Sequence, residues 1–264
     1  MQKFYIAAVI VLTLGLASVP VRAQAGIEKE QPMAADASPG FLVAAIKPSD
    51  PNTPLQGWSF ESEGHHINCR NATLTDILSM AYGIHTKQIV GAPEWFSKDH
   101  FDITGIPDVP GLPNVKQTQQ MYQKLLAERF HLVFRREIRE MPIYAITVAK
   151  SGPILKPADP GETTNTGNSG RAGERILKFR SMSMPDFALN MNFYEDRPVI
   201  DQTSLQGRYD FTLKWTYDVS RASDPDTAPL LPTAMKEQLG LKFDAVKGPA
   251  PALVIDHVER PSEN

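Results

Sequence analysis

An internal repeat is the feature of this chain that most constrains its fold. The aligned blocks are CRNATLTDIL (69–78) with FRSMSMPDFA (179–188) at an offset of 110, FDIT (101–104) with FTLK (211–214) at the same offset, and AERFHLVF (127–134) with KEQLGLKF (236–243) at 109. Similar blocks at a nearly constant period are typical of a repeated supersecondary unit. The sequence therefore predicts a tandem duplication.

Each half shows the same coarse order of elements. A strand leads into a short helix that a hydroxyl and an acid three residues later would cap, Thr73 with Asp76 and Ser183 with Asp186. A further strand and a second amphipathic helix follow, over 118–130 in the first half and 230–240 in the second. The pattern strand-helix-strand-helix-strand-strand predicts an α+β fold, with short helices packed on small, mostly antiparallel sheets.

Two strands are expected to close each half. They are HLVFRREI (131–138) with PIYAITVAK (142–150), and LKFDAV (241–246) with PALVIDHVE (251–259). The additional strands FLVAAIK (41–47) and WSFESE (58–63) find no counterpart in the second half, so we expect them to complete the first sheet or to cover one of its edges.

The N-terminus predicts export. Lys3, an apolar run and the small residues around Ala25 form a secretory signal pattern, and the run is too short to span a membrane as a helix. An uncleaved anchor is the alternative. The expected organisation is a signal peptide (1–25), a disordered linker (26–40), a first α+β module (41–158), a flexible linker (159–174) and a second α+β module (175–264). The predicted location is periplasmic or extracellular.

Composition excludes several classes of partner. The formal net charge is −3, which gives no electrostatic basis for binding nucleic acid, and no second apolar segment is long enough to span a membrane after signal cleavage. Cys69 is the single cysteine, so the chain forms no internal disulfide. Its apolar setting predicts a buried thiol that packs as a small hydrophobe.

Motifs for catalysis and for metal binding are missing from the sequence. His65 and His66 would point to opposite faces of a strand, as would Asp256 and His257, so neither pair converges on one ion or one substrate. No nucleophile elbow, phosphate loop or metal-ligand spacing occurs. The sequence therefore assigns no catalytic, cofactor-binding or metal-ligating residue, and it predicts no cofactor.

Three classes of function remain open. The favoured one is a non-catalytic binding or interaction module, not an enzyme, that takes a protein or a small-molecule ligand in the groove between the modules or at a free sheet edge, such as the strands containing Ile146 and Val254. The second is a hydrolase-type enzyme whose residues converge from both modules. Its candidates are His100, Asp102, Asp201, Asp210 and His257. The third is a structural or surface-associated protein.

The polar stretch RPVIDQTSLQGRYDFTLKW (197–215) suggests a catalytic loop at first sight. Gly207 favours a turn, however, and the apolar residues after it alternate with polar ones, as in a half-buried strand. We therefore interpret the stretch as a turn and a strand, with Asp201 and Arg208 as candidates for a binding contact only.

The chain resembles a family of exported, soil-associated proteins of acidobacteria. The motifs that carry this resemblance are FLVAAIKPSDP, ATLTDILSMAYGIHTKQIVGAPEWFSKDHFDITG, LLAERFHLVFRREIREMPIYAITVAKSGPILKPA, RPVIDQTSLQGRYDFTLKW and ALVIDHVERPSEN, within 41–264. That family is a domain of unknown function, so the resemblance implies no site residue. Related domains fused to antibiotic-sensor-type membrane metallopeptidases imply a sensing or binding role outside the cytoplasm. A weaker likeness in fold is to the small N-terminal domains of secretins and TonB-dependent transducers.

Overall fold

The computed structural model describes residues 31–52, 57–63, 66–170, 173–221 and 227–261. The unit that holds them spans Gln31–Asn264. The described residues form four short helices and twelve strands in small, mostly antiparallel sheets, so the fold is α+β as predicted. The predicted signal peptide (1–25) lies outside these residues. Within them, no helix combines the length and the apolar character needed to cross a membrane.

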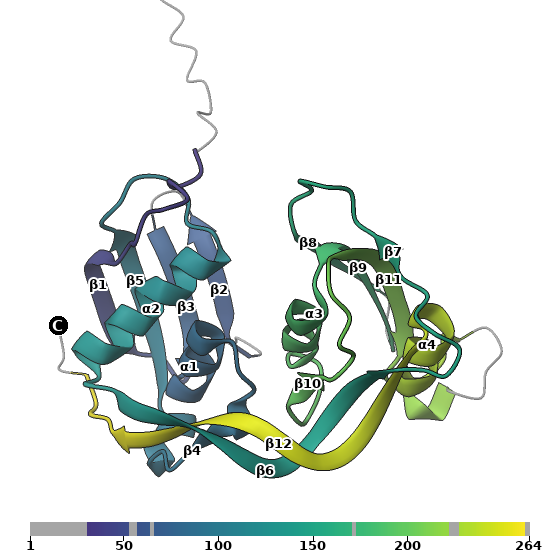
Figure 1. The fold of residues 1–264 in the computed structure, drawn as a ribbon. Helices are drawn as coiled ribbons and strands as arrows, with labels where there is room; N and C mark the ends of the chain where they lie inside the picture. Colours follow the sequence, from purple (N-terminus) through teal and green to yellow (C-terminus); the bar gives the residue numbers. More distant parts are fainter. Residues whose placement is uncertain (1–30, 53–56, 64–65, 171–172, 222–226, 262–264) are drawn as a thin grey trace, which may run out of the picture. The chain divides into compact units, whose positions relative to one another are not determined.

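The first lobe is a four-stranded antiparallel sheet with two helices. Its strands, in the order β1-β5-β3-β2, are β1 (Phe41–Pro48), β5 (His100–Pro107), β3 (His66–Thr73) and β2 (Ser59–Glu63). Helices α1 (Leu74–Tyr82) and α2 (Val115–Arg129) pack on it (Figure 1). Tyr122 and Phe130 are fully buried in the resulting core.

The second lobe repeats this arrangement. Its strands, in the order β7-β11-β9-β8, are β7 (Lys156–Pro157), β11 (Tyr209–Thr216), β9 (Glu174–Met182) and β8 (Asn165–Ser169). Helices α3 (Met184–Met191) and α4 (Leu231–Leu239) contribute to its separate apolar core, which includes Phe179 and Phe187. Short 3-10 helices lie in the connections, namely η1 (Thr86–Gln88), η2 (Glu94–Ser97) and η3 (Val219–Arg221).

A third sheet connects the two lobes. Its order is β10-β6-β12-β4, with β10 (Val199–Asp201), β6 (Val133–Val148), β12 (Leu241–His257) and β4 (Ile89–Val90). β6 and β12 pair antiparallel along almost their whole lengths, as the teal and yellow ribbons show in Figure 1. The prediction of two closing strands in each half was therefore wrong. Each half ends in one long strand, and the two long strands pair with each other.

Both long strands contain prolines. Pro142 lies in β6, and Pro249 and Pro251 lie in β12. In the structure they lie between the segment of β6 that pairs with β10 and the segment of β12 that pairs with β4. There the ribbon has only two strands, so the backbone N–H groups that point away from the partner strand make no hydrogen bond within the sheet. A proline at such a position, which has no N–H, therefore removes no hydrogen bond.

The long strands cross from one lobe to the other. Leu253 and Ile255, near the C-terminal end of β12, are buried in the core of the first lobe. Ile146, near the C-terminal end of β6, is buried in the core of the second lobe. Each core is thus completed by a strand from the other half of the chain. The strands containing Ile146 and Val254, predicted as free edges, both lie inside the sheet.

Local sequence signals place the helix ends. The Thr73 side chain accepts a hydrogen bond from the backbone N–H of Asp76, whose side chain accepts in return from the N–H of Thr73. The Ser183 side chain likewise accepts a hydrogen bond from the backbone N–H of Asp186 at the start of α3. Gly240 ends α4 in the left-handed region at φ 65°, where a Cβ would lie 2.1 Å from the Gly152 carbonyl oxygen. These caps were predicted from the sequence.

The pairing registers of the two lobes correspond, but not at the predicted offset. Cys69 pairs with Ile103 in the first sheet, and Phe179, 110 residues after Cys69, pairs with Phe211 in the second. Ile103 therefore corresponds to Phe211 at an offset of 108, not 110. A two-residue slip keeps every side chain on the same face of a strand, so alternation alone does not reveal it. The tandem duplication itself stays a prediction.

The predicted extra strands also have counterparts. β1 and β2 are the edge strands of the first sheet, as expected, but β7 and β8 hold the same two places in the second. Lys47 pairs with Asp102, and Lys156 pairs with Asp210. The sequence search missed this correspondence because β7 is only two residues long and β8 has five fully polar or glycine positions.

The two predicted linkers contain ordered backbone where they are described. Within 31–40, the Met33 N–H donates to the Leu112 carbonyl (2.8 Å), and the Gly40 N–H donates to Asp108 (2.8 Å). Within 159–174 lies the edge strand β8. Polar composition gave no sign of the contacts within 31–40, because each of them depends on a partner segment far along the chain.

Candidate functional site

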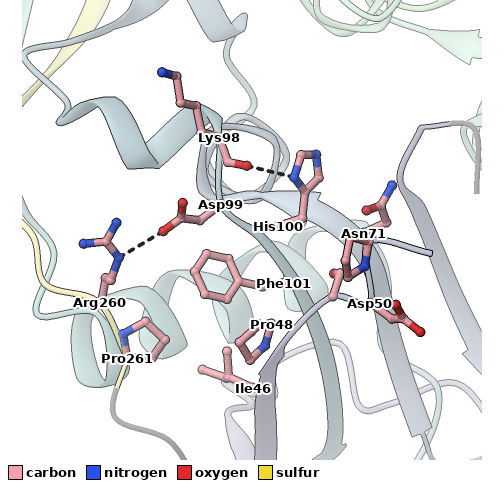
Figure 2. Close-up of a pocket in the computed structure, with 12 residues that line it drawn as sticks. Ile46, Pro48, Asp50, Asn71, Lys98, Asp99, His100, Phe101, Arg260 and Pro261 are labelled. Atoms are coloured by element: carbon pink, nitrogen blue, oxygen red, sulfur yellow. Dashed lines mark hydrogen bonds and ion pairs between the residues drawn. The ribbon is translucent and has the colours of Figure 1, made fainter. Parts of the chain in front are cut away.

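Two cavities are candidates for a functional site. The first has a volume of about 470 Å³ and lies at the start of β5 beside the C-terminal residues of the described chain. Figure 2 shows its apolar floor, Ile46, Pro48 and Phe101, and the polar groups around it. It contains the predicted candidate His100, whose Nδ1–H donates to the Lys98 carbonyl oxygen (3.0 Å).

The cations of this first cavity are already paired. Arg260 donates to the Asp99 carboxylate (2.9 Å), as Figure 2 shows, and its guanidinium lies 4.9 Å from the centre of the Trp95 ring. Lys98 pairs with Glu94. These exposed pairs contribute little stability, but they leave few unpaired charges to attract an ionic ligand.

The second cavity, which we call the interlobe cleft, has a volume of about 410 Å³. The first lobe contributes side chains from β2, from the C-terminal end of α1 and from the start of α2, and the second lobe contributes α3 and the residues after it. The apolar side chains that line the cleft are Phe60, Met80, Ile84, Val115, Leu189 and Phe193.

Several apolar side chains of the interlobe cleft are unusually exposed to solvent. Val115 is 75% exposed, Phe193 is 60% exposed and Phe60 is 37% exposed. Single exposed hydrophobic residues are common on protein surfaces. Several around one concavity are typical of a binding surface. This clustering distinguishes the interlobe cleft from the cavity of Figure 2.

Three of the six described polar residues that line the cleft carry carboxamides, Gln119, Asn190 and Asn192. Gln119 donates to the Met80 carbonyl oxygen (3.1 Å), and Asn192 accepts from the Val199 N–H (2.8 Å). The buried Oδ1 of Asn190 has no hydrogen-bond partner among the described residues. Asp186 is the one carboxylate of the lining, and it accepts from the Ser183 hydroxyl (2.6 Å).

A hydrogen bond joins the two lobes next to this cleft. Nδ1 of His85 accepts from the Lys87 N–H (3.0 Å), which places the ring proton on Nε2, 3.2 Å from the Glu195 carbonyl oxygen. Burial lowers the pKa of His85, so the neutral ring that this arrangement needs is favoured. Lys87 also lies 3.9 Å from Asp196.

Glu195 carries the most perturbed carboxyl group near the cleft. Its burial, and then the neighbouring Asp196 carboxylate, raise the pKa of Glu195 from 4.5 to about 7. Asp196 itself accepts from the Tyr144 hydroxyl (3.2 Å) and lies 3.6 Å from Arg197. No sequence motif pointed to Glu195, because its pKa depends on a tertiary environment.

The structure does not gather the predicted enzyme candidates at one centre. His100 and Asp102 belong to β5 of the first lobe, and Asp210 to β11 of the second. Asp102 accepts from the Ser49 hydroxyl (2.7 Å) and the Asn71 N–H (2.8 Å), and Asp210 accepts from the Ser181 N–H (2.8 Å). Both carboxylates therefore hold backbone in place.

The remaining candidates also have local partners. Asp201 accepts from the N–H and hydroxyl of Thr203 (2.9 and 2.7 Å) in a tight turn. His257 lies 2.9 Å from Glu259, while Asp256 pairs with Arg135. Arg208 Nη1 donates to the Thr164 hydroxyl and to the Ser181 carbonyl oxygen, both at 2.7 Å. Neither Asp201 nor Arg208 lines the interlobe cleft.

In the described part of the chain, Cys69 is buried and the histidines form no metal-binding cluster. Cys69 is fully buried, as predicted, and burial raises the pKa of its thiol to about 12, with Asp76 and Asp102 adding to the shift. Among the described residues, no group of three or more His, Cys, Asp or Glu side chains lies close enough together to hold a metal ion. His65 lies outside the described residues.

A family model described as "Protein of unknown function (DUF3738)" matches residues 75–258. The chain belongs to the DUF3738 family. The DUF3738 region begins in α1 and includes every apolar residue of the interlobe cleft except Phe60. No curated protein matches this chain. No solved structure matches it either.

The residues of the interlobe cleft escaped the sequence analysis for one reason. Most apolar residues of α1 and α3 are buried, so apolar character alone does not mark the few that line the cleft. Val115 and Phe193 lie just beyond the regular apolar pattern, at a helix start and after a helix end. Apolar residues at helix ends, outside the amphipathic pattern, are the sequence signal that marks these positions.

Proposed function

We propose that this protein is an exported, non-catalytic binding module whose small-molecule ligand occupies the interlobe cleft. The observation that carries the proposal is the clustering of Phe60, Val115 and Phe193, all solvent-exposed, around one cavity of about 410 Å³. Cavities of a few hundred Å³ with apolar walls and a few fixed polar groups are typical ligand sites.

Two further observations support the proposal, one for binding over catalysis and one for export. The carboxylates named as enzyme candidates hold turns and strand bulges, and the perturbed Glu195 has no nucleophile or base bonded to its carboxyl among the described residues. The signal pattern of 1–25 and the resemblance to exported soil-associated proteins support a place outside the cytoplasm.

Titration of the full chain with N-phenyl-1-naphthylamine, whose fluorescence rises in apolar surroundings, tests the site. We expect one saturable site per chain and at least a fivefold higher Kd in Phe193→Ser. Val219→Ser is the matched control, because Val219 is 74% exposed and does not line the cleft. Equal affinities in wild type and Phe193→Ser would refute the proposal.

A further inference from the structure

We propose that the interlobe cleft selects uncharged, predominantly apolar small molecules and excludes anions. This inference rests on the proposed function and names the ligand class of the same site. It starts from the charges of the lining. None of the described residues that line the cleft is Lys, Arg or His, and Asp186 is the one acidic residue among them.

An anion would lose solvation in this cleft without gaining a partner. The Asp186 carboxylate already accepts from Ser183 and lies 3.8 Å from the guanidinium of Arg208, a residue that does not line the cleft. Lys87 and Arg197 do not line the cleft either, and both pair with Asp196, at 3.9 and 3.6 Å. Moving a charge into an apolar site without a counter-charge is strongly unfavourable.

The neutral polar groups fit an uncharged ligand. Gln119, Asn190 and Asn192 carry carboxamides, which have no charge, and those of Gln119 and Asn192 are held in place by hydrogen bonds to backbone groups. The other cavity differs in kind, since Lys98, His100 and Arg260 line it. Discrimination by charge is therefore a property of the interlobe cleft and not of every concavity of the fold.

Two fluorescent probes with the same ring skeleton test the inference on the full chain. N-phenyl-1-naphthylamine is uncharged, and 8-anilino-1-naphthalenesulfonate adds a sulfonate to it. We expect the wild-type Kd of the uncharged probe to be at least tenfold lower. Val115→Lys, at a 75% exposed position of the rim, should lower the Kd of the sulfonate probe at least threefold and change that of the uncharged probe less.

Controls separate the possible failures. Val219→Lys adds the same charge elsewhere and should leave both Kd values unchanged, while far-ultraviolet circular dichroism checks that each variant is folded. Similar Kd values for the two probes, both raised by Phe193→Ser, would overturn the charge selection and leave the site standing. A Kd for the uncharged probe that Phe193→Ser does not change would overturn the site and this inference with it.

Discussion

Asp102 and Asp210 accept the same hydrogen bond in two different sheets. Each carboxylate lies 2.8 Å from the backbone nitrogen of a residue in the left-handed region, Asn71 at φ 54° and Ser181 at φ 46°. Both of those residues lie at a strand irregularity just before a capped helix. The carboxylates thus stabilise a left-handed backbone conformation, which asparagine tolerates at Asn71 and which is unfavourable for the serine at Ser181.

Removing either carboxylate should destabilise the fold. Asp210→Ala is expected to lower the free energy of unfolding by about 1–3 kcal/mol, because the Ser181 N–H loses its partner. Asp210→Asn keeps an acceptor oxygen and should cost less. Asp244→Ala, at a half-buried position paired with Lys242, should change stability by less than about 0.5 kcal/mol. Urea unfolding measures all three, and equal stabilities of Asp210→Ala and Asp244→Ala would contradict the role.

Because β12 completes the core of the first lobe, a substitution near the C-terminus should destabilise that lobe. Leu253→Ala should lower the free energy of unfolding by about 2–4 kcal/mol, because Leu253 is buried in the core of the first lobe. Ile138→Ala, in the middle of the β6–β12 ribbon and 71% exposed, should cost less than about 1 kcal/mol. Guanidinium denaturation measures the free energy of unfolding of both variants and of the wild type. A small loss for Leu253→Ala would contradict the crossing of β12 into the first lobe.

Two asparagines of the cleft should respond in opposite directions to the same substitution. Asn190→Leu removes a buried acceptor without a partner among the described residues, so stability should stay level or rise by about 1 kcal/mol. Asn192→Leu removes the acceptor of the Val199 N–H and should lower stability by about 1–2 kcal/mol. Thermal unfolding distinguishes the two, and a loss in Asn190→Leu as large as in Asn192→Leu would count against this assignment.

Glu195 should make stability fall as pH rises. Its pKa is raised from 4.5 to about 7 in the folded protein, so the folded state binds the proton more tightly than the unfolded state. The cost is absent below pH 4.5, grows as pH rises from about 4.5 to about 7, and is complete above that. Glu195→Gln should remove this cost, a gain of about 1–2 kcal/mol at pH 8 after allowance for screening by solvent.

His85 acts in the opposite direction, which determines the design of that experiment. Burial lowers the pKa of His85 in the folded state. Its contribution to stability is therefore fully present above the unfolded pKa of 6.5, and it is lost as pH falls from there through the lower folded pKa. Denaturation of wild type and Glu195→Gln at pH 5 and at pH 8 cancels the His85 contribution, because both proteins retain His85. A stability difference between them that is equal at the two pH values would refute the shifted pKa.

Much of the local structure was predictable because its causes are local. The capping box of Thr73 and Asp76, the C-cap at Gly240 and the alternation along β11 each depend on neighbours within a few residues. The misalignment of FDIT over FTLK shows the limit of such patterns. Strand alternation has a period of two, so registers that differ by two residues look alike until hydrogen bonds select one.

The sequence by itself determined the class of this fold, the ends of its helices and the burial of Cys69, since propensity, capping and apolar periodicity are encoded in short segments. Only the tertiary structure decided that β6 and β12 pair with each other, that Leu253 and Ile146 complete opposite cores, and that Val115 and Phe193 line one cleft. These are choices among partners far apart in the chain. They depend on which arrangement buries the most apolar surface and satisfies the most backbone groups.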